Sequence, residues 1–76
     1  MQIKYTKQAL KFLQKQPPAA QKRLTDAISQ IPLGDIKKLQ GQKSYRLRVG
    51  DYRIIFDHLG NIIEIIKIGN RGDIYK

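Results

Sequence analysis

The fold of this chain is decided by residues 44–57, which read Ser44-Tyr45-Arg46-Leu47-Arg48-Val49-Gly50-Asp51-Tyr52-Arg53-Ile54-Ile55-Phe56-Asp57. Polar and apolar residues alternate over the first six positions, which predicts a β-strand with Arg46 and Arg48 on one face. Gly50-Asp51 predicts a tight two-residue turn that begins with glycine. Across this turn Arg53 falls on the same face as the other two arginines. The hairpin therefore has an apolar inner face and an outer face with three arginines.

The residues before this hairpin favour helices. Residues 2–5 alternate as a short strand does, and Thr6 is then suited to cap a helix over residues 7–16. The apolar stripe of that helix is Ala9, Leu10, Phe12 and Leu13. Pro17-Pro18 separates it from a second helix, which Pro32 and Gly34 end.

The remaining segments complete the sheet. Residues 33–43 are a polar connection that Ile36 and Leu39 can anchor, and residues 58–61 are a turn. Residues 62–68 are almost continuous isoleucine, which is typical of a central strand covered on both faces. The predicted order is β-α-α-β-β-β. It describes an α+β fold with two N-terminal helices packed on a small twisted antiparallel sheet, in one domain over residues 1–76.

Composition limits the possible functions. The chain has 76 residues with 15 Lys plus Arg against 6 Asp plus Glu, a net charge of +9. A folded domain this basic usually has a polyanionic partner. Because it has no cysteine and one histidine, we expect no disulfide, metal or cofactor. No apolar run is long enough to cross a membrane and no signal peptide begins the chain, so a cytoplasmic protein is expected.

The strongest candidate site is the arginine face of the hairpin. Arg46 and Arg48 project about 7 Å apart along one strand, and Arg53 lies beside them. With Arg71 in a later loop they form a cationic surface suited to phosphate. The expected RNA-binding residues are Lys43, Arg46, Arg48, Arg53, Lys67 and Lys76. The alternative is a solvated face whose arginines pair with Asp51, Asp57 or Glu64.

The aromatic residues and the histidine are weaker indicators of a functional site than the arginines. Tyr45 and Tyr52 alternate with the arginines, which favours a position in the core. Tyr75 near the end of the chain suits either docking of the C-terminus or a role beside a nucleic-acid base. His58 is interpreted as a turn residue.

Several segments in this order resemble the RelE/ParE superfamily of bacterial toxins. They are Ala9-Leu10-Lys11-Phe12-Leu13, Lys37-Lys38-Leu39-Gln40-Gly41, residues 45–56 and Ile68-Gly69-Asn70-Arg71-Gly72-Asp73-Ile74-Tyr75. The resemblance implies the toxin of a type II toxin–antitoxin pair, neutralised by an acidic antitoxin protein. The RelE branch cleaves mRNA in the ribosomal A site by metal-free attack of a 2′-OH on phosphorus. The ParE branch inhibits DNA gyrase without being an enzyme.

The resemblance also implies catalytic roles. Arg46 and Arg48 match basic residues of the first hairpin strand, and Arg53 matches the arginine that holds the scissile phosphate. Arg71 matches the arginine that supports the leaving group, and Tyr75 the tyrosine that stacks on the mRNA base. Arg48 stands where RelE has a lysine general base, and a guanidinium cannot readily accept a proton. The general base is therefore open, with Tyr75, water or a ribosomal group as candidates, and gyrase inhibition or a non-toxic RNA-binding module remain alternatives.

Overall fold

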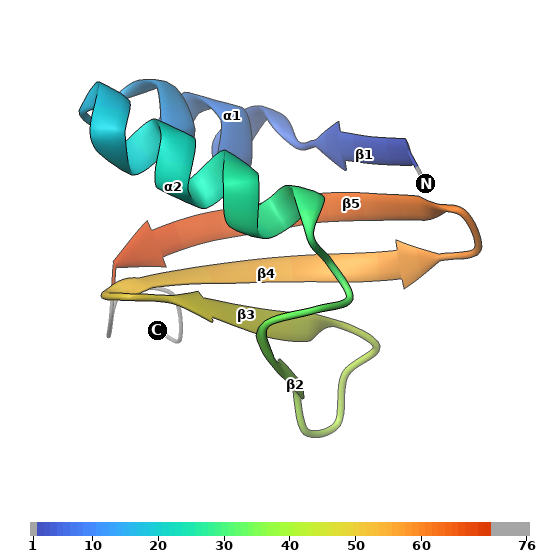
Figure 1. Ribbon diagram of the computed structural model, residues 1–76. Coiled ribbons are helices and arrows are strands. Elements are labelled where there is room, and N and C mark those ends of the chain that lie inside the picture. Colours follow the sequence, from blue (N-terminus) through green and yellow to red (C-terminus); the bar gives the residue numbers. More distant parts are fainter. Residues whose placement is uncertain (1, 71–76) are drawn as a thin grey trace.

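The computed structural model describes residues 2–70, which form a five-stranded sheet with two helices on one face (Figure 1). In chain order the elements are β1 (Gln2–Tyr5), α1 (Lys7–Gln14), α2 (Pro18–Ser29), β2 (Asp35–Lys38), β3 (Tyr45–Val49), β4 (Tyr52–Leu59) and β5 (Ile62–Asn70). The strands lie in the order β1-β5-β4-β3-β2. The predicted α+β class, with two N-terminal helices against a sheet, is confirmed.

The hairpin of β3 and β4 has the predicted register. Val49 lies opposite Tyr52, so the turn contains only Gly50 and Asp51, and Gly50 has a φ of 57°. This left-handed conformation favours glycine because a side chain there meets the backbone. The second turn was predicted over residues 58–61, but in the structure it is shorter, because β4 continues through His58 to Leu59.

The sheet differs from the prediction in two respects. The predicted connection over residues 33–43 contains the edge strand β2, which pairs with β3 along its whole length. The sheet is mixed and not purely antiparallel, because β1 runs parallel to β5. The parallel pairing joins segments 60 residues apart, whereas β2 pairs with β3, the next strand along the chain. The local residue pattern of Asp35-Ile36-Lys37-Lys38 carries little strand signal, since only Ile36 is apolar.

The two helices begin where the sequence predicts. The Thr6 hydroxyl oxygen accepts a hydrogen bond from the Ala9 N–H and caps α1. It also donates to the Ile66 carbonyl at 2.6 Å, which ties the helix to β5. α1 ends at Gln14, two residues earlier than predicted, and Pro18 starts α2. Leu10 was expected on the apolar stripe but is 42% exposed.

The core lies between the helices and the sheet. Its buried residues are Ala9, Leu13, Leu24, Ile28, Ile31, Leu47, Val49, Ile54, Phe56, Ile63, Ile65 and Ile68. Three of these isoleucines come from β5, where their spacing changes from two residues to three. A β-bulge explains the change, because Ile55 pairs with Lys67 and Phe56 pairs with Ile65, so that Ile66 is left over. The bulge keeps Ile63, Ile65 and Ile68 on the helix side and leaves Lys67 on the opposite face.

Candidate functional site

The face of the sheet opposite the helices carries the candidate site, and strand register places its residues in two rows. Directly paired residues share a face. The first row crosses the sheet as Asp35, Arg48, Arg53 and Gly69, on β2, β3, β4 and β5. The second row, two residues along, is Lys37, Arg46, Ile55 and Lys67. These two rows hold five cations and one carboxylate, and the next pair on the same face, Asp57 with Glu64, is acidic.

Asp35 is the carboxylate of the two rows, and it lies near two of the arginines. Its Oδ2 is 3.5 Å from Arg48 Nε, and its Oδ1 is 3.8 Å from Arg46 Nη2. The sequence suggested Asp51, Asp57 or Glu64 as partners, but among residues 2–70 the arginine face pairs only with Asp35. Sequence reasoning missed Asp35 because it assigned residues 33–43 to a connection. The polar–apolar alternation of Asp35-Ile36-Lys37 was the available signal.

The two arginines of β3 differ in exposure. The Arg48 side chain is 50% exposed, whereas the Arg46 side chain is 17% exposed. Arg46 Nε is buried and has no hydrogen-bond partner among the described residues. A buried N–H donor without a partner costs free energy, about 1–3 kcal/mol. Arg46 therefore keeps an unused donor next to the Asp35 carboxylate.

Arg53 lies on the predicted face but is buried, with 7% exposure, and not on an open outer surface. Its Nη1 donates to the Gly50 carbonyl at 3.1 Å and to the Tyr52 carbonyl at 3.0 Å. Neither acceptor carries a formal charge. Within residues 2–70 no carboxylate lies within 4.0 Å of this guanidinium, so no ion pair in this part of the chain neutralises its charge. Its position is fixed by the turn beside it.

A further arginine from α2 approaches the same turn. A Cβ added at Gly50 would lie 2.8 Å from Arg23 Nη2. The Arg23 guanidinium therefore sits against the Gly50 backbone, at the end of the sheet where Arg53 is held. The sequence offered no signal for this approach, because Arg23 lies on the helix and only the packing of α2 brings it to the turn.

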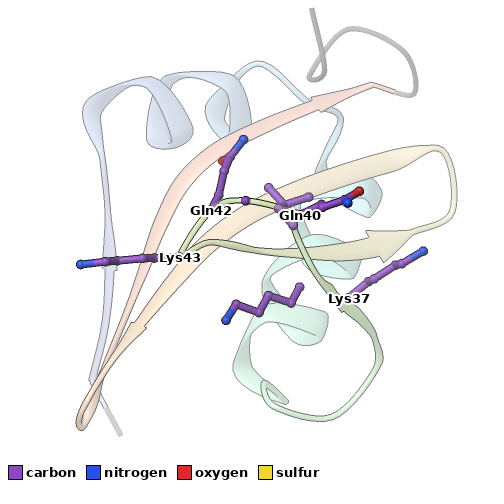
Figure 2. Close-up of a pocket in the computed structure, with 7 residues that line it drawn as sticks. Lys37, Gln40, Gln42 and Lys43 are labelled. Atoms are coloured by element: carbon purple, nitrogen blue, oxygen red, sulfur yellow. The ribbon is translucent and has the colours of Figure 1, made fainter.

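Lys43 lies apart from the rows, in the loop between β2 and β3. This loop encloses an open hollow of about 740 Å³ lined by Lys37, Lys38, Leu39, Gln40, Gly41, Gln42 and Lys43 (Figure 2). Lys37 belongs to both the hollow and the second row. Arg71, Tyr75 and Lys76 lie outside the described residues, so their predicted roles stay predictions.

The helix side of the sheet holds the aromatic residues. Tyr45 and Tyr52 pack against the core, as predicted, and the Tyr45 ring stacks on Phe56 at a centroid distance of 5.5 Å. A smaller hollow of about 240 Å³ is lined by Pro32, Ile36, Tyr45, Phe56 and His58. His58 is therefore a strand residue at the rim of this hollow. Burial raises the pKa of Tyr5 above its ordinary value, so this phenol stays neutral.

The described residues contain no cluster of three His, Asp or Glu side chains that could hold a metal ion. No helix within residues 2–70 is long and apolar enough to cross a membrane.

The fold and the cationic sheet face define a small basic α+β domain of the kind found in toxin–antitoxin pairs. The family model for the ParE toxin of type II toxin–antitoxin systems matches residues 3–75. The chain belongs to this family, within the RelE/ParE superfamily, and is a toxin of a type II toxin–antitoxin system.

Two solved archaeal structures are similar to the chain in both sequence and fold. The RelB–RelE antitoxin–toxin complex from Methanococcus jannaschii matches with 31% identity and a TM-score of 0.76, covering 95% of this chain and 94% of that one. The RelE–RelB complex from Pyrococcus horikoshii OT3 matches with 33% identity and a TM-score of 0.73, covering 95% and 96%.

A YoeB/ParE toxin from Agrobacterium tumefaciens shares the fold, with a TM-score of 0.74 and 19% identity over 93% of this chain and 99% of that one. No protein of curated function is significantly similar in sequence.

Proposed function

We propose that this toxin is a ribosome-dependent mRNA endonuclease. The observation that carries the proposal is the row Asp35–Arg48–Arg53, which combines a proton acceptor with two guanidinium groups on the face that the helices leave uncovered. The burial of Arg53 without a carboxylate beside it among the described residues supports a role in holding a phosphate.

In the proposed reaction the 2′-oxygen of the RNA attacks the adjacent phosphorus. In this proposal Asp35 is the general base and takes the 2′-hydroxyl proton. The 2′-oxygen–phosphorus bond forms and the bond from phosphorus to the 5′-oxygen breaks. The products are a 2′,3′-cyclic phosphate and a 5′-hydroxyl, and the departing oxygen takes its proton from water.

The cationic residues bind the phosphate and stabilise the charge that develops during the reaction. Arg53, fixed by the Gly50 and Tyr52 carbonyls, holds the scissile phosphate, and Arg48 stabilises the charge of the pentacovalent phosphorane. Arg46, whose side chain is 17% exposed, adds positive charge beside Arg48. Following the resemblance, Arg71 supports the leaving group and Tyr75 stacks on the base. Lys43, Lys67 and Lys76 bind the RNA outside the reacting bond.

The second candidate is inhibition of DNA gyrase, because the family model that matches the chain is that of the ParE toxin. In that case the cationic face binds a protein or DNA surface and no RNA is cleaved. In both cases an acidic antitoxin protein neutralises the toxin. The net charge of +9 and the similarity to toxins solved with their antitoxins support that partner.

The test is to induce the toxin and to follow leucine and thymidine incorporation together with primer extension on a defined mRNA. We expect leucine incorporation to stop first, with codon-phased cuts in translated messages. Arg48→Ala should abolish both effects, whereas the matched control Lys11→Ala on the far side of the molecule should keep them. Early loss of thymidine incorporation with intact messages would overturn the proposal in favour of gyrase inhibition.

A further inference from the structure

A cationic loop beyond the arginine rows is not used by the proposed chemistry. It spans residues 37–43 and contains three lysines and no acidic residue. Lys37, Lys38 and Lys43 are all exposed, and none of them takes part in an ion pair among the described residues. Three uncompensated charges within seven residues create a strong local positive potential.

The loop has a defined shape and does not extend freely. The Leu39 N–H donates to the Ser44 carbonyl at 3.0 Å, and the Gln42 N–H donates to the Leu39 carbonyl at 3.3 Å. Gly41 completes the bend with a φ of 71°. No atom lies within 4 Å of the position that a Cβ of Gly41 would occupy, so the backbone there is open to a ligand. The folded loop encloses the hollow of about 740 Å³.

The direction of the side chains limits what the hollow can bind. Lys37 and Lys43 extend to opposite sides of the loop, with Gln40 and Gln42 between them in sequence (Figure 2). Diverging ammonium groups cannot enclose one small anion. They can each contact a different phosphate of an extended chain, while the two carboxamides can donate to sugar or base oxygens.

The hollow is also continuous with the candidate site. Lys37 lies opposite Arg46 on the neighbouring strand, about 5 Å away across the ladder. The cations of β4 and β3 therefore connect through Lys37 to the loop, with Asp35 beside them. At the other end of the loop Asp57 accepts a hydrogen bond from the Ser44 hydroxyl at 2.6 Å. An RNA strand that lies on the arginines reaches the loop at the β2 edge of the sheet.

We propose that the hollow of residues 37–43 is a separate docking site for the phosphodiester backbone of RNA, which holds the strand beyond the scissile bond. The proposal rests on the proposed function, because it assigns the loop to the same RNA. The site binds and does not react, so it contributes to affinity and to salt dependence but not to the rate of the chemical step.

The test compares the triple variant Lys37→Ala, Lys38→Ala, Lys43→Ala with the control Lys7→Ala, Lys11→Ala, Lys15→Ala. Both lose three exposed lysines, but the control changes only α1 and the residue after it. The probe is a fluorescent single-stranded RNA oligonucleotide, titrated between 50 and 200 mM KCl. For single-stranded RNA, three phosphate contacts change the slope of log affinity against log salt concentration by about 2. The wild type should therefore lose about 20-fold more affinity over this range than the loop variant. The control should follow the wild type.

Two further measurements separate the outcomes. In ribosome-dependent cleavage the loop variant should raise KM and leave kcat unchanged, and its melting temperature should stay close to that of the control. A wild-type salt slope and KM in the loop variant would refute the docking site even if the toxin cleaves RNA. If the wild type cleaves nothing but the loop variant still loses the salt slope, the docking site stands and the endonuclease proposal fails. A polyglutamate peptide serves as the acidic-protein probe. If the loop variant binds this peptide more weakly than the wild type does but binds RNA equally well, the proposal is overturned and the loop is assigned to an acidic protein.

Discussion

Replacement of Asp35 by asparagine separates catalysis from stability. The substitution keeps the shape of the side chain and removes its charge and most of its basicity. If Asp35 is the general base, cleavage should fall by about 10²–10⁴-fold. That fall corresponds to about 3–5 kcal/mol in the activation free energy.

The expected cost in stability is much smaller. Asp35 is 55% exposed, and its contacts with Arg48 and Arg46, at 3.5 and 3.8 Å, are longer than the best charge-assisted hydrogen bonds. Exposed ion pairs of this kind contribute about 0.2–1 kcal/mol. For a domain of this size 1 kcal/mol corresponds to about 4–8 °C, so the melting temperature should fall by no more than about 8 °C.

RNA binding should change in the opposite direction. A carboxylate about 6 Å from a phosphate repels it by about 0.7 kcal/mol in water, so Asp35→Asn should bind RNA about threefold more tightly. A mutant that binds substrate better and cleaves it far more slowly is the signature of a lost proton acceptor. A variant that only misfolds would lose both properties.

The assay is single-turnover cleavage of a ribosome-bound mRNA at saturating toxin, with binding measured on the same variants. Asp26→Asn is the matched control, because Asp26 also forms an exposed ion pair, with Lys22 at 3.0 Å, but lies on α2. We expect the control to cleave at the wild-type rate and Asp35→Glu to recover part of the activity. Wild-type cleavage by Asp35→Asn would refute Asp35 as the base.

Three further substitutions test the structure around the site. Gly50→Ala should destabilise the fold by about 1–2 kcal/mol in a thermal melt, because φ is 57° and the new Cβ meets Arg23. Gly60→Ala is the control, because Gly60 has a φ of 59° but open space around it, so the same melt should report the backbone strain alone. Thr6→Ala removes both the cap of α1 and the hydrogen bond to Ile66, so urea unfolding should report a loss of about 1–3 kcal/mol, and Thr6→Ser should restore most of it. Ile65→Ala leaves a cavity in a fully buried position and should cost about 2–5 kcal/mol by urea unfolding, whereas Ile62→Ala in the partly exposed part of the same strand should cost less.

The sequence predicts those parts of the fold whose signal is local. The alternation in residues 44–49, the Gly50-Asp51 turn and the cap at Thr6 are short-range patterns, and the register, turn and helix start follow from them. The signal for β2 is weak, because the alternation of Asp35-Ile36-Lys37 contains one apolar residue and the strand is stabilised by its pairing with β3. The parallel pairing of β1 with β5 joins segments about 60 residues apart, which no local pattern specifies.

The candidate site, like the fold, was predictable where its signal is local. Turn parity put Arg46, Arg48 and Arg53 on one face, and the register agrees. The burial of Arg53 and the approach of Arg23 depend on how elements far apart in the chain pack, so the residue pattern alone could not supply them. The position of Asp35 follows from the pairing of β2 with β3, for which residues 35–37 carry only a weak signal. The face on which Lys67 lies depends on the bulge, which breaks the alternation that a reader of the sequence would follow through β5.

The bulge at Ile66 divides β5 into two segments with different neighbours. Residues 62–65 pair with β1 as well as with β4, whereas residues 67–70 pair with β4 alone among the described strands. The Thr6 hydroxyl binds the carbonyl of Ile66 at the boundary. The first segment therefore carries the pairing with β1, and the second carries Lys67 and Gly69 of the cationic face together with the core residue Ile68. Because Lys67 lies on the face opposite Ile68, substitutions at Lys67 can change the cationic face while Ile68 keeps its place in the core, so one scaffold can present different surfaces to different cellular targets.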